Sequence, residues 1–571
     1  MYSYDFFLSD SLEKVFPLKR PVPMGEKTLP VFEGMIPAVQ LVYKRHCDGT
    51  RPPFVTPIKI SVLGTPVKPV FRFVELVPAD FPCYEETDSD YITTEPGLFP
   101  DVLVPADDNL DYIHVKPLSG QYRSVWIDFP GITAAEAGVH KITVITEAEK
   151  EVSLHDGSIK TDPLAAGFRQ ELNFSLDVKR QVLPAQNLLH TQWFHTDCLS
   201  SYYKVEVLSE AHWKLIEAFI QPMFKRYGIN TLLTPVFTPP LDTEPGMERP
   251  AVQLVDIIKN GNTYTFNFDK LKKWCALCKK HGITHIEVPH FFTQWGARWT
   301  PKIIAKENNT EKRIFGWDVS ATSPEYRVFL EQFIPALRKA LDENGYDKNH
   351  TIFHVSDEPA KDQREDYLKA KEIINKLTEG SLVVDALCDI EFYREGIVEH
   401  PVPATNHAAP FIEEGIPDLW VYYCSGQYYE VPNRFFAMPS VRIRAMGILL
   451  YYFDIKGFLH WGYNFYYSQN SKKTINPFLE ASGIRAWPAG DPFLVYPGDN
   501  GQLLSSIRGE VHRESLEDIR LLNLLEKRIG RESVLTLIKE DFPFPLSFMH
   551  YPREPLYYSR LREKAAQLLE E

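Results

Sequence analysis

Apolar and polar residues alternate in short runs over roughly the first 180 residues, and clusters of proline, glycine and aspartate separate these runs. The clearest runs are residues 59–62, 71–76, 124–129 and 141–145. A period of two predicts half-buried β-strands, and no helical period of useful length occurs here. We therefore expect an N-terminal β-sandwich domain over residues 1–183, because Pro184 closes the last alternating run.

From residue 187 onward, short apolar runs alternate with long amphipathic segments, as in βα units around a parallel sheet. The predicted strands are residues 188–194, 231–237, 285–289, 352–355, 382–386, 404–407, 419–423 and 458–461. The predicted helices include residues 210–227, 268–281, 323–345 and 363–378. This order predicts an α/β fold, a (β/α)8 TIM-type barrel catalytic domain with C-terminal helices over residues 184–571. A doubly wound sheet is the alternative, which the lack of a glycine-rich phosphate turn disfavours.

The composition is that of a globular protein, with 44 % hydrophobic and 24 % charged residues. The 62 Lys and Arg against 76 Asp and Glu give a net charge of −14, and no basic stretch compensates, so nucleic acid is not an expected partner. Aromatic residues reach 13 %, and the 44 prolines outnumber the 30 glycines. Aromatic rings at strand ends suit the binding of sugar rings, so their positions matter more than their number.

Targeting and membrane signals are missing from the sequence. The N-terminal stretch carries Asp5 and Asp10 where a signal peptide needs a basic and then an apolar region. No run approaches about 18 apolar residues, the length that spans a bilayer. Seven cysteines without framework spacing fit reduced thiols, so we expect a soluble, cytoplasmic protein without a membrane partner. Cys275 and Cys278 lie in a predicted helix with an apolar stripe, which favours buried thiols over a metal site.

The residues with the clearest chemical potential are Asp357 and Glu358, in the sequence His-Val-Ser-Asp-Glu-Pro of residues 354–359. They follow the fourth predicted strand, and barrel enzymes hold their catalytic groups at the carboxyl ends of strands. Pro359 predicts an extended backbone at Glu358. The alternative is an acidic pair that caps the next helix or faces solvent. The aromatic residues at other strand ends favour the functional interpretation.

Adjacent carboxyl groups restrict the mechanism. Ordinary glycosidases hold two carboxyl groups about 5–5.5 Å apart across the sugar, or farther apart when they invert. Neighbours on one strand start on opposite faces, but a twisted strand end can turn both inward. One carboxyl could then protonate the leaving oxygen while the other serves a 2-acetamido group, whose carbonyl oxygen acts as nucleophile. The charge of the ionised neighbour should also raise the pKa of the acid by repulsion and keep that acid protonated near neutral pH.

Four motifs together resemble glycoside hydrolase family 123 over residues 185–530. They are residues 356–359, residues 457–461 with Asn464, residues 490–498, and residues 506–510 leading into 514–518. The resemblance implies an N-terminal β-sandwich, a (β/α)8 domain and retaining β-N-acetylgalactosaminidase activity through an oxazolinium intermediate. It implies that Asp357 orients the acetamido group and that Glu358 is the general acid/base. His460 stands where a tyrosine is expected and residues 465–466 where a tryptophan is expected, which concerns the sugar more than the reaction.

Further candidates lie at the predicted strand ends, and for each of them packing in the core is the alternative. Trp461 is a candidate floor for the sugar ring and Asn464 a candidate partner for a hydroxyl. The predicted substrate-binding residues are Trp193, His290, Trp295, Tyr422, Tyr423, Trp461, Tyr463 and Asn464. The charged residues of the late helix are expected to form salt bridges that tie it to the barrel, namely Arg508, Glu510, Arg513, Glu517 and Asp518.

The sequence therefore predicts a glycoside hydrolase that removes terminal β-linked N-acetylgalactosamine from a small oligosaccharide or glycoside. No metal and no cofactor is expected. Two alternatives remain, a glycan-binding protein without turnover and a glycosidase of another specificity on the same barrel, because the fold alone does not determine the substrate.

Overall fold

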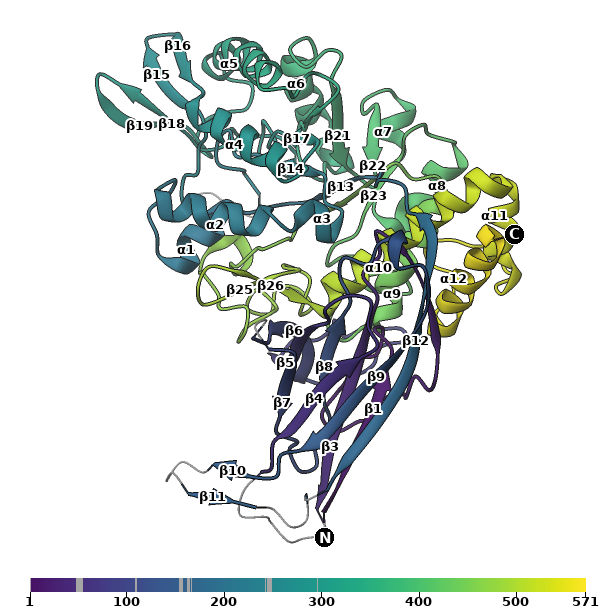
Figure 1. The fold of residues 1–571 in the computed structure, drawn as a ribbon. Helices are drawn as coiled ribbons and strands as arrows, with labels where there is room; N and C mark the ends of the chain where they lie inside the picture. Colours follow the sequence, from purple (N-terminus) through teal and green to yellow (C-terminus); the bar gives the residue numbers. More distant parts are fainter. Residues whose placement is uncertain are drawn as a thin grey trace.

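The computed structural model describes residues 2–47, 55–107, 110–153, 158–161, 165, 167–241, 243, 249–294 and 296–570. Its N-terminal strands form two large sheets, and the following residues form a parallel sheet surrounded by helices (Figure 1). Among the predicted site residues, Trp295 lies outside the described residues.

The two N-terminal sheets enclose a common buried core, to which Leu41 and Val125 of one sheet and Ile142 and Leu176 of the other contribute. The seven-stranded sheet has the order β1 (Tyr2–Ser9), β3 (Ala38–Cys47), β8 (Arg123–Asp128), β5 (Val70–Ala79), β6 (Gly97–Pro105), β26 (Leu503–Ser506) and β25 (Tyr496–Pro497). The five-stranded sheet has the order β2 (Thr28–Glu33), β12 (Arg169–Val182), β9 (Gly138–Ala148), β4 (Ile58–Leu63) and β7 (Tyr112–Val115). The β-sandwich predicted from the alternating runs is thus present.

Two strands of the first sheet come from the far end of the chain. β26 pairs antiparallel with β6, with Ser505 opposite Leu103, and β25 pairs with β26. The sequence placed these strands in the barrel domain, because alternation reveals a strand but not its partner. The division at residues 183 and 184 remains a proposal, and these strands cross it.

The parallel sheet has eight strands with helices between them, so a barrel is present as predicted. Its order is β22 (His400–Val402), β21 (Leu382–Ala386), β20 (Thr351–Phe353), β17 (His285–Glu287), β14 (Thr231–Leu233), β13 (Leu189–Gln192), β24 (Gly457–His460) and β23 (Trp420–Tyr422). A parallel bridge between Ala404 and Tyr422 brings the two edge strands together and nearly closes the barrel.

The sixth predicted strand was misplaced. Residues 404–407 were expected to form it, whereas β22 ends at Val402 and Thr405–His407 form a 3-10 helix. Pro401 and Pro403 have no N–H to donate to a sheet, so the sequence around this strand is unusual. In the structure the carbonyl of Pro403 instead accepts a hydrogen bond from the Tyr422 backbone at 3.1 Å, so proline is compatible with this barrel edge.

Helices follow the barrel strands in chain order. They are α1 (Thr196–Tyr203), α2 (Glu210–Ile220), α3 (Met223–Tyr227), α4 (Asp269–Lys280), α5 (Pro324–Glu343), α6 (Arg364–Asn375), α7 (Glu391–Arg394), α8 (Ala408–Glu413), α9 (Ser440–Tyr452), α10 (Ile507–Ile529), α11 (Arg531–Glu540) and α12 (Pro555–Glu570). A four-stranded sheet of β15 (Asp256–Asn260), β16 (Thr263–Asn267), β18 (Ile303–Glu307) and β19 (Thr310–Phe315) lies among them. The helix predicted over residues 210–227 is split before α3 at Pro222. Ser323 caps α5 as expected, accepting from the Tyr326 N–H at 3.3 Å.

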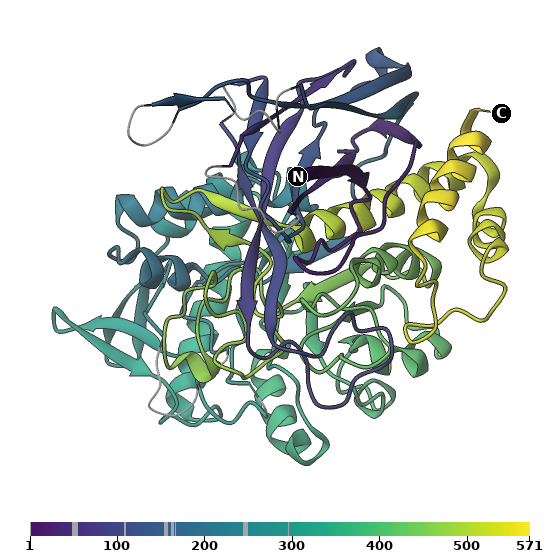
Figure 2. The ribbon, with the colours of Figure 1, turned by 90° about the horizontal axis from the view of Figure 1, so that it is seen from below.

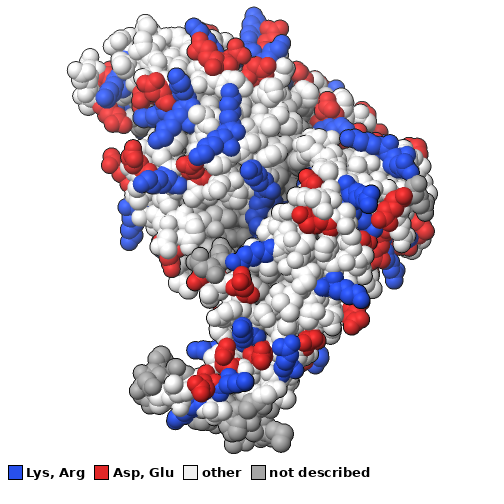
Figure 3. All heavy atoms as spheres, in the orientation of Figure 1, with Lys and Arg blue, Asp and Glu red and all other residues white. Residues whose placement is uncertain are grey.

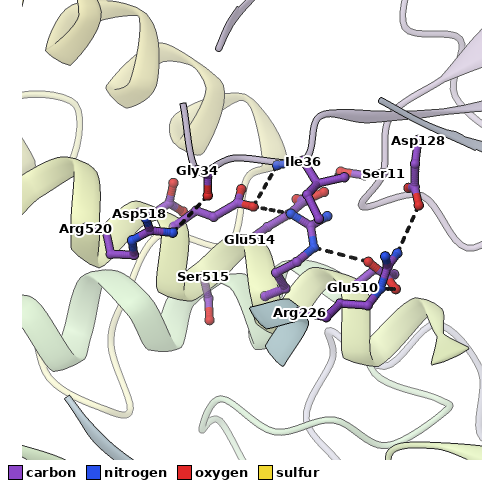
Figure 4. Close-up of polar contacts among 12 residues, drawn as sticks. Ser11, Gly34, Ile36, Asp128, Arg226, Glu510, Glu514, Ser515, Asp518 and Arg520 are labelled. Carbon is purple, nitrogen blue, oxygen red and sulfur yellow. Dashed lines mark hydrogen bonds and ion pairs between the residues drawn. The ribbon is translucent and has the colours of Figure 1, made fainter. Parts of the chain in front are cut away.

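Helix α10 lies between the N-terminal sheets and the barrel (Figure 1), and the C-terminal helices flank this junction in yellow in Figure 2. Glu510 of α10 accepts hydrogen bonds from Arg72 of β5 and from Arg226 of α3, each at 2.8 Å. Arg226 also reaches Asp128 of β8 at 2.9 Å (Figure 4). Arg508 bonds Asp101 of β6 at 2.9 Å. The charged residues of this helix therefore tie it to the N-terminal sheet as well as to the barrel, which corrects the expectation of barrel contacts alone.

Within the described ranges, no helix combines the length and the apolar character needed to cross a bilayer. The face of the molecule in Figure 3 mixes Lys and Arg with Asp and Glu. Cys275 and Cys278 are buried free thiols in α4, as the apolar stripe predicted.

Candidate active site

Three barrel strands converge on Glu358. Asp357 and Glu358 lie just beyond β20, and both side chains are partly exposed. The Glu358 Oε1 accepts a hydrogen bond of 2.5 Å from the hydroxyl of Tyr422, the last residue of β23. The Glu358 backbone N–H donates to the carbonyl of Ala386, the last residue of β21, at 3.1 Å. The predicted carboxylate pair and one predicted strand-end tyrosine thus meet at the carboxyl end of the barrel.

The backbone of Glu358 is left-handed, with φ of 45°. The sequence predicted an extended conformation because Pro359 follows. The hydrogen bonds to Ala386 and Tyr422 hold both the backbone and the side chain of Glu358, and they override the local preference. A side chain in this region costs about 1–3 kcal/mol, and such strain gathers at functional sites.

Asp357 carries a proton more readily than an ordinary aspartate. Burial raises its pKa well above the usual value, and the negative charges of Glu358 and Asp385 raise it further. Among the described residues, no cation forms an ion pair with the Asp357 carboxyl. Asp357 is therefore the carboxyl group of the pair whose surroundings disfavour its charge.

Asp385 of β21 stabilises the chain just beyond β20 through hydrogen bonds. Its Oδ1 accepts the backbone N–H groups of Val355 at 2.9 Å and Ser356 at 3.3 Å, and its other oxygen accepts the Tyr367 hydroxyl. Burial raises the pKa of Asp385 to about 6. The sequence analysis missed this residue, although a charged side chain within the apolar run of β21 was an available signal.

A buried network orients the first and fourth strand ends. Glu287 of β17 accepts hydrogen bonds from Trp193 Nε1 at 2.7 Å, from Thr191 Oγ1 at 2.5 Å and from His354 Nε2 at 2.7 Å. Trp193 is 3 % exposed, so this bond fixes its indole against the barrel interior. Glu287 was also missed, and it too is an acidic residue within a barrel strand.

His290 lies between these groups, with its ring centroid 4.4 Å from that of His354 and 5.4 Å from that of Trp193. Neither ring nitrogen of His290 has a hydrogen-bond partner among the described residues. The ligand atoms of His290, His354 and Asp385 lie within 4.8 Å of one another, so these residues could hold a metal ion. Asp385, however, already accepts three hydrogen bonds that support the strand end, and an ion would compete with them. The expectation of a metal-independent site stays a prediction.

Trp461 follows β24 and is partly exposed. Its Nε1 donates to Asp491 Oδ2 at 2.9 Å, and its rings pack against Phe465 and Trp487 with centroids 5.0 Å away in each case. Burial raises the pKa of Asp491 to about 7. Asp491 belongs to the motif of residues 490–498, which the sequence analysis noted without a role for this side chain.

Three other predicted residues lie in the packed interior. The Asn464 side chain accepts from the His195 N–H at 2.9 Å and donates to the His195 carbonyl at 3.1 Å. The Tyr463 hydroxyl donates to the Phe219 carbonyl at 3.1 Å, and the Tyr423 ring packs on Phe458. These contacts place Asn464, Tyr463 and Tyr423 in the walls behind the strand ends.

A parallel barrel with two carboxyl groups and aromatic side chains at the carboxyl ends of its strands has the site of a glycoside-cleaving enzyme. The family model "Glycoside hydrolase 123, catalytic domain" matches residues 193–525. The chain belongs to glycoside hydrolase family 123 and is a glycoside hydrolase, as the four motifs suggested.

A solved family 123 glycoside hydrolase from Clostridium perfringens, described in terms of glycolipid glycan hydrolysis, has 16 % identity and a TM-score of 0.71. The alignment covers 99 % of this chain and 97 % of that chain, and at this identity it shows a common fold. A xylanase of Clostridium thermocellum has 8 % identity and a TM-score of 0.31, with 90 % and 94 % coverage, which is too remote to inform the site. No curated protein matches the sequence.

Proposed function

We propose that this chain is a retaining β-N-acetylgalactosaminidase, of the β-N-acetylhexosaminidase type, on a (β/α)8 TIM-type barrel. It removes terminal β-linked N-acetylgalactosamine by substrate-assisted catalysis. The observation that carries the proposal is the placement of Asp357 and Glu358 side by side on one strand end, with Glu358 held in a left-handed backbone. Adjacent carboxyl groups suit a reaction in which the substrate itself supplies the nucleophile. The choice of N-acetylgalactosamine rests on the family resemblance.

In the first step, Glu358 donates its proton to the glycosidic oxygen while the carbonyl oxygen of the 2-acetamido group attacks the anomeric carbon. The bond to the leaving group breaks, and an oxazolinium ion forms. In the second step, Glu358 takes a proton from water, and the water oxygen attacks the anomeric carbon. This attack opens the oxazolinium ring, and the anomeric configuration of the product is that of the substrate. The Tyr422 hydroxyl occupies Glu358 Oε1, so the other oxygen is the one that serves the leaving group.

Asp357 faces the acetamido group in this proposal. Burial and neighbouring negative charge raise its pKa, so its ionised form is unstable without a positive partner. The amide N–H and the positive charge that develops on the oxazolinium supply such a partner in the transition state. An interaction that strengthens as the reaction proceeds lowers the barrier rather than merely binding the substrate.

The sugar ring would lie on Trp461, whose indole Asp491 holds in place. His290, whose ring nitrogens have no hydrogen-bond partner among the described residues, is buried beside Trp193, and we propose that both residues contribute to the wall of the sugar site. Asn464, Tyr463 and Tyr423 would support this surface from behind. The Clostridium perfringens relative is described with glycolipid glycans, and for this chain we propose the end of a small oligosaccharide or glycoside.

A panel of 4-nitrophenyl β-glycosides tests the proposal. We expect release of nitrophenol from the N-acetylgalactosaminide and less from the N-acetylglucosaminide, with inhibition by the matching thiazoline. Asp357→Asn should lower kcat/KM by about 10²–10³-fold, because it removes charge stabilisation in the transition state. The exposed Asp362→Asn is the matched control.

Undiminished hydrolysis of the β-galactoside, which lacks the acetamido group, would overturn substrate assistance. Glycan binding without hydrolysis of any member of the panel would overturn the enzymatic proposal and favour a glycan-binding protein.

A further inference from the structure

The segment of residues 80–96, which joins β5 to β6, leaves the N-terminal sheet and binds the loops at the active-site end of the barrel. Its Phe81 carbonyl accepts from the Ala489 N–H at 2.9 Å, in the loop after β24. Its Ile92 N–H donates to the Ala437 carbonyl at 2.8 Å, in the loop after β23. The N-terminal half of the chain therefore touches both loops that follow the strands of Tyr422 and Trp461.

Charged groups hold this segment firmly. Arg442 of α9 forms ion pairs with Asp88 and, at 3.0 Å, with Asp90. The second oxygen of Asp88 accepts the Glu430 N–H at 2.7 Å, and the Tyr91 hydroxyl donates to the Tyr428 carbonyl at 2.6 Å. Because Arg442 and Asp88 are buried, their contacts resist displacement, and the segment has a defined position against the barrel.

Tyr84 is an aromatic residue of this segment that packs on the loop after β23. Its ring lies edge-on to that of Tyr428, with centroids 5.0 Å apart. Phe81, three residues before Tyr84, accepts the hydrogen bond from Ala489, and Asp491, two residues after Ala489, holds the Trp461 indole. The segment that carries Tyr84 therefore binds both the loop after Tyr422 and the loop that positions the candidate sugar floor.

The carboxylate pair is close to the same loop. Glu358 accepts a hydrogen bond from Tyr422, which directly precedes this loop, and Glu358 is the group that would protonate the leaving oxygen. Tyr84 packs on Tyr428, six residues after Tyr422 in the chain, which makes Tyr84 a candidate for the leaving-group side. Tyr84 itself is partly exposed, so its ring is accessible to a ligand.

We propose that Tyr84 completes the active site on the leaving-group side and binds the sugar to which the terminal N-acetylgalactosamine is attached. Aromatic rings offer sugars a large rigid apolar surface, and a tyrosine adds a hydroxyl at its edge. The N-terminal sheet thereby contributes a specificity residue to the barrel. This inference rests on the proposed function.

The test compares two substrates that differ only in the leaving group. One is a β-N-acetylgalactosaminyl-galactose disaccharide, and the other is β-N-acetylgalactosaminyl azide, whose leaving group has no ring. Release of N-acetylgalactosamine is measured for the wild type, Tyr84→Ala, Tyr84→Leu and Tyr84→Phe. Tyr112→Ala is the matched control, a partly exposed tyrosine of β7 in the same half of the chain.

We expect Tyr84→Ala and Tyr84→Leu to lower the ratio of kcat/KM for the disaccharide to that for the azide by about tenfold, mainly through KM. Tyr84→Phe should keep most of the ratio, and Tyr112→Ala all of it. Tyr84→Leu retains apolar volume, so it tests the ring if the alanine variant does not fold.

A wild-type ratio in Tyr84→Leu overturns the role of Tyr84 while leaving the proposed function intact. Failure of the wild type to cleave either substrate overturns the proposed function instead, so the two outcomes are distinguishable.

Discussion

Two groups of acidic residues in this protein have opposite surroundings. On α10, Glu510 is buried and accepts hydrogen bonds from Arg72, Arg226 and, at 3.2 Å, Arg513. Burial alone would raise the pKa of Glu510, but the three arginines hold it well below its ordinary value. At the end of β20, Asp357 has burial and like charge without a cation, and its pKa moves well above its ordinary value.

The difference between Glu510 and Asp357 shows that a buried carboxyl group can serve either the stability of the fold or the chemistry that we propose for the site. A buried carboxylate with arginine partners is satisfied in the folded protein, and it joins the elements that carry those partners. A carboxyl group without such partners is held in an unfavourable environment, which a proton or a positively charged substrate group relieves. Perturbed groups of the second kind are often found at functional sites. The comparison makes four predictions.

Glu358→Gln should have the largest effect. It removes the proposed acid, so kcat/KM on the 4-nitrophenyl N-acetylgalactosaminide should fall by about 10²–10⁴-fold. The melting temperature should stay close to that of the wild type, because Glu358 is partly exposed and glutamine still offers an acceptor to Tyr422. Glu365→Gln on the exposed side of α6 is the control. Activity within tenfold of the wild type would contradict the assignment.

Glu510→Gln should lower the free energy of unfolding by about 3–5 kcal/mol at pH 7, because Arg72, Arg226 and Arg513 each lose one of their two carboxylate partners in a buried network. Denaturant titration measures this loss, with exposed Glu532→Gln as the control. Because the folded-state pKa of Glu510 is depressed, its stabilisation is present above the unfolded pKa of about 4.3 and declines as pH falls below it. A loss under about 1 kcal/mol would show that the network matters little.

Denaturant titration of Asp357→Asn tests the other side of the comparison, because the pKa of Asp357 is raised in the folded state whereas that of Glu510 is lowered. A raised folded-state pKa means that Asp357 contributes stability at low pH, which is lost as pH rises through that pKa. We therefore expect the asparagine variant to be at least as stable as the wild type at pH 7. Destabilisation at pH 7 would show that the Asp357 charge has a partner after all.

Of the two variants expected to lose activity, Tyr422→Phe should have the smaller effect. It removes one hydrogen bond to a carboxylate, for which a loss in kcat/KM of about 10- to 100-fold is expected. Tyr452→Phe on α9, which is partly exposed, controls for the loss of a phenol elsewhere. A loss equal to that of Glu358→Gln would indicate that Tyr422 has a role in the chemistry beyond positioning.

The sequence was most informative where the evidence is local. Alternation predicted the N-terminal strands, apolar runs predicted most barrel strands, and the neighbouring Asp357 and Glu358 needed no folding to be found together. The sequence was least informative about which residues form hydrogen bonds with one another. Asn464 was recognised in its motif, but its bonds to the His195 backbone join two residues that lie 269 positions apart in the sequence. Glu287 and Asp385 were missed because their roles depend on neighbouring strands.

The sequence by itself determined the order of most elements, the family and the adjacency of Asp357 and Glu358, because periodicity and short motifs are properties of neighbouring residues. Only the tertiary structure decided that β26 joins the N-terminal sheet, that the acids of α10 meet arginines from both halves, and that Glu358 adopts a left-handed backbone. The physical reason is that burial, charge pairing and strain depend on distances between segments that are remote in the chain, and folding alone brings those segments together.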